Sequence, residues 1–171
     1  EAARVDPETI ELHFALGNLF RRRGETDRAI RVHQNLIERD GLSTKQRLHA
    51  LSELGQDYLK AGLLDRAEEI FLKLRGTERD EEALKNLLEI YQQEKEWAKA
   101  IDQLQRIVPD SEYYVDARIQ LAAVYQRQEK TPAAIAELQQ ALEAKGKNAE
   151  LLAYLAALHR EEKQYPQAIA V

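Results

Sequence analysis

The sequence predicts an all-α fold, a right-handed superhelical solenoid built from antiparallel helix pairs. One observation is a repeat: an alanine anchors the same pattern at positions 29, 67, 100, 134 and 168, so the steps are 38, 33, 34 and 34 residues. Another is composition. Charged residues make up 32% of the 171 residues, 7 glycines and 4 prolines are present, and no stretch alternates β-branched residues as strands do.

Each repeat carries two short motifs. The first is L-G-N-L-F at 16–20 and L-G-Q-D-Y at 54–58, with weaker copies at 87–91 and 121–125. The second, A-x-x-x-F, joins each alanine to a large residue: His33, Phe71, Leu104 and Leu138. At a period of 34, this combination resembles the tetratricopeptide repeat, in which two helices pack around the small alanine. We therefore expect His33 to be packed in the core.

The first two helices are expected on either side of a turn at a glycine. Helix one runs from Ile10 to about Arg23, and Gly24 permits the left-handed turn that ends it. Helix two runs from Asp27, its expected N-cap, to Arg39. The stripe expected to face inward on helix one is Leu12, Ala15, Leu16, Leu19 and Phe20.

The other helices follow the same spacing. They are expected at 44–61, 64–75, 80–94, 97–107, 113–128, 132–144, 149–162 and from 165 onward. The step of 38 lengthens the turn at 40–47, where Ser43 or Thr44 is the expected helix cap.

The repeats divide the whole chain. Residues 1–9 are expected to end an upstream repeat, and five repeats follow at 10–43 (with the extended turn), 44–80, 81–114, 115–148 and 149–171, the last truncated. Methionine is absent, including at position 1. We therefore expect the natural protein to continue in both directions, and the cut ends to permit self-association.

Composition excludes several classes of function. The net charge of −5 argues against nucleic acid as a partner, and cysteine is absent, so the segment has no disulfide or thiolate metal site. No apolar run approaches the ~20 residues of a membrane span. Phosphate-loop, zinc-protease and nucleophile-elbow motifs are missing. We predict that this segment is not an enzyme and holds no cofactor or metal.

The first helices of the repeats are expected to line a concave groove that binds a protein or peptide ligand. Counting along those helices places amides, cations and aromatic groups there, which suit an extended peptide. The predicted groove residues are Phe14, Asn18, Arg22, Ser52, Gln56, Lys60, Lys85, Asn86, Glu89, Gln126, Arg127 and Tyr154, with Arg21, Gln93, Gln120 and Arg160 beside them.

Residues 16–71 also resemble a narrower family. The features are G-x-x-D-R-A-I-R at 24–31, L-G-x-D-Y at 54–58, A-G-L-x-D-R-A-E at 61–68 and E-W-x-K-A-I-D at 96–102. They resemble the cytoplasmic repeats of the lipopolysaccharide assembly protein B family of Gram-negative bacteria. That family has a membrane helix before its repeats and a rubredoxin-like zinc domain after them, so membrane attachment would lie outside this chain.

The resemblance implies a cytoplasmic adaptor at the inner membrane face that regulates lipopolysaccharide synthesis. It would bring an FtsH-type membrane protease to the deacetylase of lipid A synthesis. Two alternatives remain open: the substrate-recognition repeats of an O-linked N-acetylglucosaminyl transferase, or a generic co-chaperone. For the co-chaperone, Asn18 matches one amide of the two-carboxylate clamp, but Phe14 and Glu53 replace its lysine and a further asparagine.

Overall fold

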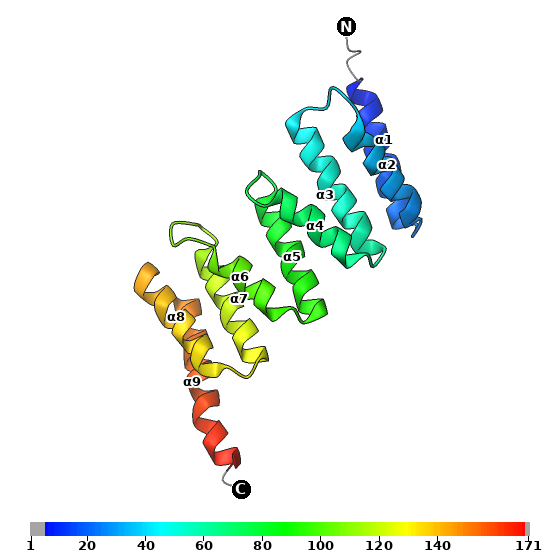
Figure 1. Ribbon diagram of the computed structural model, residues 1–171. Helices are drawn as coiled ribbons and strands as arrows, with labels where there is room; N and C mark the ends of the chain where they lie inside the picture. Colours follow the sequence, from blue (N-terminus) through cyan, green and yellow to red (C-terminus); the bar gives the residue numbers. More distant parts are fainter. Residues whose placement is uncertain (1–5, 170–171) are drawn as a thin grey trace. The chain divides into compact units, whose positions relative to one another are not determined.

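Helices form all the regular structure in residues 6–169, the part of the chain that the computed structural model describes (Figure 1). In order they are α1 (Pro7–Arg22), α2 (Thr26–Glu38), α3 (Thr44–Lys60), α4 (Leu64–Leu74), α5 (Asp80–Glu94), α6 (Trp97–Gln105), α7 (Tyr114–Arg127), α8 (Thr131–Lys145) and α9 (Ala149–Ile169). The prediction of an all-α fold of paired helices is confirmed for these residues. Most of the expected upstream repeat end, residues 1–5, lies outside them.

The chain forms two compact units, Glu1–Gln93 and Glu94–Val171. In the first, α1 packs on α2 and α3, and α3 packs on α2 and α4. In the second, α7 packs on α6 and α8, and α8 packs on α9. Each unit thus buries its apolar side chains between successive antiparallel helices.

The repeated alanines are buried as the spacing predicts. Ala29, Ala67, Ala100 and Ala134 are all 0% exposed. The fifth, Ala168, lies outside the residues whose side chains are described. A methyl group at these positions allows close packing, which a larger side chain would prevent.

The glycine of each L-G motif lies against the large residue of the following helix. A Cβ atom at Gly55 would lie 2.7 Å from Cζ of Phe71, and one at Gly17 would overlap the ring of His33. Both rings are 0% exposed. The two sequence motifs are therefore the two sides of one helix contact, and His33 is packed in the core as predicted.

The turns inside the pairs share one backbone geometry. Gly24 and Gly62 adopt the left-handed conformation (φ +80° and +74°), and Glu129 occupies the same position at φ 60°. After each of the three, the next N–H bonds back to a carbonyl of the preceding helix, as in Glu25 N–H to Phe20 O at 2.9 Å. Glycine is therefore favoured at this turn but not required.

Of the two expected helix N-caps, Ser43 is confirmed and Asp27 is not. Ser43 caps α3: its Oγ accepts from the Gln46 N–H at 3.1 Å, and Gln46 Oε1 accepts from the Ser43 N–H at 2.9 Å. The expectation that Asp27 caps α2 is wrong, because the helix already starts at Thr26. The Glu25 carbonyl accepts from the N–H groups of Arg28 and Ala29, so Asp27 lies in the first turn.

The end of the chain also differs from expectation. The sequence predicted a turn before Tyr165, but α9 continues to Ile169. By repeat spacing, the turn position here is Lys163, not a glycine. Lys95 and Glu129 adopt the left-handed conformation at the two preceding turns, so the absence of glycine does not by itself explain the continued helix.

Four of the five residues expected to face inward on α1 are instead exposed, and the fifth, Phe20, is half-buried. Leu12, Leu16 and Leu19 are 69%, 41% and 46% exposed, and Ala15 is exposed as well. The buried residues of α1 are Ile10, Phe14 and Gly17, which face α2 and α3. In later repeats, the residues equivalent to Leu16, such as Leu54 and Leu87, are buried because another helix precedes them. Among the described residues, no helix precedes α1.

The contact between Gly55 and Phe71 predicts a strong substitution effect. Gly55→Leu should lower the free energy of unfolding by about 1–3 kcal/mol, because the new side chain overlaps the buried ring. Helix propensity alone would raise the free energy of unfolding by about 0.8 kcal/mol, because leucine favours a helix more than glycine does. Urea unfolding followed by circular dichroism measures the difference.

Glu69→Leu is the control for Gly55→Leu, since it adds the same side chain at an exposed position of the neighbouring helix α4. It should leave the unfolding midpoint within experimental error. If the two variants unfold alike, α3 and α4 do not approach each other at Gly55.

Candidate functional site

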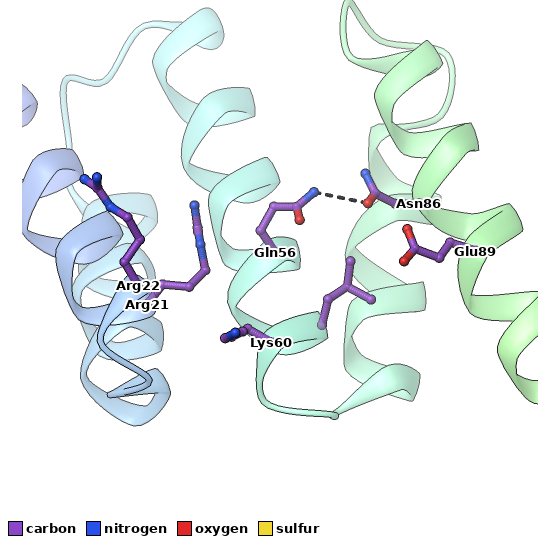
Figure 2. A pocket seen from close by; sticks show the side chains of 7 residues that line it. Arg21, Arg22, Gln56, Lys60, Asn86 and Glu89 are labelled. Atoms are coloured by element: carbon purple, nitrogen blue, oxygen red, sulfur yellow. Dashed lines mark hydrogen bonds between the residues drawn. The ribbon is translucent and has the colours of Figure 1, made fainter.

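The first unit has a pocket on the face shared by α1, α3 and α5. Its volume is ≈ 520 Å³. Figure 2 shows its side chains reaching in from the three helices. The lining residues are Arg21, Arg22, Gln56, Leu59, Lys60, Asn86 and Glu89. Five of these belong to the predicted groove set, and Arg21 was expected beside them. Leu59 was not predicted to line the pocket, because an apolar residue on a helix is expected to lie in the core.

Arg21 forms a fixed wall of this pocket. Its Nη1 donates to Asp57 Oδ1 at 2.9 Å and to the Glu53 carbonyl at 3.1 Å. Its Nη2 donates to Glu53 Oε2 at 2.7 Å. Burial by itself lowers the pKa of Arg21, but hydrogen bonds and charges from Glu53 and Asp57 outweigh burial and raise it. Two carboxylates therefore hold this guanidinium on α3.

A buried pair lies beneath Arg21. His33 on α2 donates from Nδ1 to Asp57 Oδ2, and both side chains are 0% exposed. The other ring nitrogen of His33, Nε2, has no hydrogen-bond partner and lies against Gly17. Each oxygen of Asp57 thus accepts a hydrogen bond, one from α1 and one from α2. Burial of a carboxylate requires such pairing.

Glu53 contacts a different side chain through each of its carboxylate oxygens. His49 Nε2 lies 3.4 Å from Glu53 Oε1, and Arg21 binds the other oxygen. Burial alone raises the pKa of Glu53. The hydrogen bonds from His49 and Arg21 and their positive charges outweigh burial and lower the pKa to about 2. Glu53 is therefore ionised at neutral pH and serves to position Arg21.

Two cations of the pocket are unpaired. Arg22 and Lys60 are both exposed, and neither forms an ion pair or hydrogen bond within the described residues. They lie on neighbouring helices, in the last turns of α1 and α3. Because their charges are not neutralised by the protein, they are available to an anionic group of a ligand.

The α5 side of the pocket is polar and acidic. Gln56 Nε2 donates to Asn86 Oδ1 at 3.2 Å, and Asn86 Nδ2 donates to the Glu82 carbonyl at 2.8 Å (Figure 2). Glu89 is exposed and makes no hydrogen bond or ion pair within the described part of the chain. The lining contains no hydroxyl, thiol or imidazole group.

Two predicted groove residues are buried in the core, so the expectation that they face a ligand is wrong. Phe14 is 3% exposed and stacks on His49 with ring centroids 4.2 Å apart. Ser52 is 1% exposed, and its hydroxyl donates to Glu82 Oε1. The helix count missed this burial, because α3 covers Phe14 and α5 covers Ser52.

Two further predicted residues of the first unit lie outside the pocket lining. Asn18 is partly buried, and its Oδ1 has no hydrogen-bond partner. Lys85 is exposed on α5. Neither belongs to the residues that line the pocket.

In the second unit, the predicted groove residues bond to one another. The hydroxyl of Tyr154 donates to Gln126 Oε1, and Gln126 Nε2 donates to Glu161 Oε2 at 2.9 Å. Arg127 lies over the Trp97 ring, 6.0 Å from its centroid. Burial and the charge of Glu161 raise the pKa of Tyr154, against the opposing effect of Arg127. These side chains are satisfied internally, unlike Arg22 and Lys60.

The chain was compared with known proteins. The family model described as tetratricopeptide repeat protein 21 ARM repeat matches residues 8–142, and one described as tetratricopeptide repeat matches residues 119–171. No helix of the described residues has the length and apolar character needed to cross a membrane.

Curated relatives and solved structures agree with these matches. Lipopolysaccharide assembly protein B of Escherichia coli K12 is 53% identical over 106 residues, which is 61% of this chain and 27% of that protein. The Haemophilus influenzae Rd protein of the same name is 45% identical over 93 residues, 54% of this chain and 24% of that protein. The chain thus spans about a quarter of the length of these curated relatives.

Among solved structures, a crystal structure of MamA protein has a TM-score of 0.62 at 23% identity and covers 96% of this chain and 88% of its own. A tetratricopeptide repeat protein from Parabacteroides merdae has a TM-score of 0.67 at 17% identity, with 93% of this chain and 62% of its own covered. At these identities the likeness concerns the fold alone.

The lowered pKa of Glu53 predicts acid sensitivity. Because the pKa is about 2 in the folded protein and near 4.5 in the unfolded chain, ionised Glu53 stabilises the fold above about pH 4.5. That stabilisation, about 2–3 kcal/mol at most, is lost as the pH falls from 4.5 towards 2. Urea unfolding of the wild type and Glu53→Gln between pH 7 and pH 3 measures it.

The stability gap between wild type and Glu53→Gln should narrow as the pH falls. Glu69→Gln is the matched control, because Glu69 is exposed on α4 and has no hydrogen-bond or ion-pair partner within the described residues. A gap that stays constant from pH 7 to pH 3 would show that Glu53 carries no shifted pKa.

Proposed function

Because the chain belongs to the tetratricopeptide repeat family of protein-interaction scaffolds, we propose that its α1–α3–α5 pocket binds a segment of a partner protein. The observation that carries this proposal is the pair of unpaired cations, Arg22 and Lys60, beside an open polar pocket. A carboxylate of the partner would form charge-assisted hydrogen bonds with them. Gln56 Oε1, which has no partner within the described residues, can accept an N–H of a peptide backbone.

The pocket is preorganised for such a ligand. Arg21 is fixed by Glu53 and Asp57, so its side chain does not need to be ordered when a ligand binds. A wall that is already ordered reduces the entropy cost of association. The ligand then gains its specific contacts from Arg22, Lys60 and Gln56.

The likeness to lipopolysaccharide assembly protein B supports a more specific role. In this proposal, the chain is the adaptor part of a regulator of lipopolysaccharide synthesis at the cytoplasmic face of the inner membrane. It brings an FtsH-type membrane protease to the deacetylase of lipid A synthesis. One of these two proteins supplies the segment that enters the pocket.

Charge reversal in the pocket tests the proposal. The double variant Arg22→Glu/Lys60→Glu should reduce recovery of the purified deacetylase or protease in a pull-down by about tenfold. Each reversal replaces an attraction by a repulsion, and exposed charge pairs contribute about 0.2–1 kcal/mol each. Circular dichroism of the variant should match that of the wild type, since both residues are exposed.

The matched control is Lys45→Glu/Lys73→Glu. Both lysines are exposed and lie outside the pocket, so this variant has the same net charge as the pocket variant. It should recover the partner at the wild-type level. Full recovery by Arg22→Glu/Lys60→Glu would rule out this pocket as the binding site.

A further inference from the structure

We propose that the pocket selects an extended peptide with two opposite charges: an acidic side chain over α1 and α3, and a basic side chain over α5. This inference rests on the proposed function and specifies its ligand. It follows from how the unpaired charges are distributed over the three helices that line the pocket.

The positive end is formed by two of the three cations. Arg21 is neutralised by Glu53 and Asp57, at 2.7 and 2.9 Å. Arg22 and Lys60 have no such partners within the described residues, so they provide the free positive charge. Both come from helices on one side of the pocket, α1 and α3. A ligand carboxylate is therefore stabilised at that side.

The negative end is Glu89 on α5. It is the only carboxylate among the residues that line this pocket, and it is exposed without a partner within the described residues. In Figure 2 it lies on the opposite side of Gln56 from Arg21 and Arg22. A second acidic residue of the ligand would be repelled there, whereas a lysine or arginine would be attracted.

The middle of the pocket is neutral. Gln56 and Asn86 join α3 to α5 by a hydrogen bond of 3.2 Å, and Gln56 Oε1 has no partner within the described part of the chain. That oxygen is free to accept an N–H of a peptide backbone. Leu59 adds apolar surface beside it.

Helix spacing sets the distance between the two charges. Packed helices lie about 8–10 Å apart, and an extended chain advances about 3.3 Å per residue. The positive side lies between α1 and α3, about one and a half helix spacings from α5, so an extended peptide covers that distance in about four residues. Because side chains alternate along an extended peptide, about four residues should separate the acidic and basic residues.

Two peptide probes test whether the pocket prefers opposite charges. Both are capped, about ten residues long and built mainly of alanine, serine and glutamine. One carries a glutamate and, about four residues later, a lysine; the other carries glutamate at both positions. Titration into the ¹⁵N-labelled chain, followed by chemical shifts, yields the two dissociation constants for the wild type and Glu89→Lys.

The wild type should bind the glutamate–lysine peptide about threefold more tightly than the glutamate–glutamate peptide, a ratio typical of one exposed charge pair. Glu89→Lys should reverse that preference. Glu69→Lys, an equal charge change at an exposed position of α4 outside the pocket, should preserve it. Because a peptide can lie in either direction, the test compares the charges present and not the order in which they are written.

Three results would overturn the inference: equal affinities of the two peptides for the wild type, the same preference in wild type and Glu89→Lys, or no binding of either peptide to the wild type. The pull-down separates this failure from failure of the proposed function. If Arg22→Glu/Lys60→Glu loses the partner while the peptide preference is the same in wild type and Glu89→Lys, the pocket binds a partner without Glu89 selecting a basic residue.

Discussion

The arrangement of the first unit depends on the two hydrogen bonds that the buried carboxylate of Asp57 accepts. Asp57 lies on α3 and accepts hydrogen bonds from Arg21 on α1 and His33 on α2, so one buried group joins three helices. A buried carboxylate that loses one partner typically costs about 3–5 kcal/mol. Helices α1, α2 and α3 are therefore held in the register that satisfies both of its oxygens.

This buried group also shapes the surface. Arg21 reaches Asp57 from the pocket, and the fixed guanidinium forms one wall of it. Arg21 thus both pairs with the buried Asp57 and lines the pocket. Because Glu53 and Asp57 neutralise Arg21, the unpaired positive charge of the pocket comes from Arg22 and Lys60. The same basic run, Arg21-Arg22-Arg23, thus supplies one residue that carboxylates of α3 hold and one that is unpaired within the described part of the chain.

The two units use related side chains in different ways. In the second unit, Gln126 bonds to both Tyr154 and Glu161, so its amide is occupied by the protein itself. In the first unit, Arg22, Lys60 and Glu89 remain unpaired among the described residues. A free charge at the edge of a pocket has a larger effect on specificity than a side chain that must first break an internal hydrogen bond.

The repeat spacing was sufficient to predict the helix pairs, the buried alanines and the glycine turn, because these depend on local geometry that recurs every 34 residues. It also predicted most of the pocket lining. It did not predict that Phe14 and Ser52 are buried, since their exposure depends on how closely α3 packs against α1 and α5. The exposed Leu16 shows the same limit: its motif is that of Leu54, but the neighbouring helix differs.

The sequence by itself determined the fold class, the register of the helices and the family, because side-chain periodicity and a small residue at each crossing are written in the order of residues. Only the tertiary structure decided which charged side chains form ion pairs within the described part of the protein and which do not. Arg21 and Arg22 are adjacent and chemically identical. One is neutralised because two carboxylates from α3 lie within 3 Å of it, at 2.7 and 2.9 Å, and no local pattern specifies that distance.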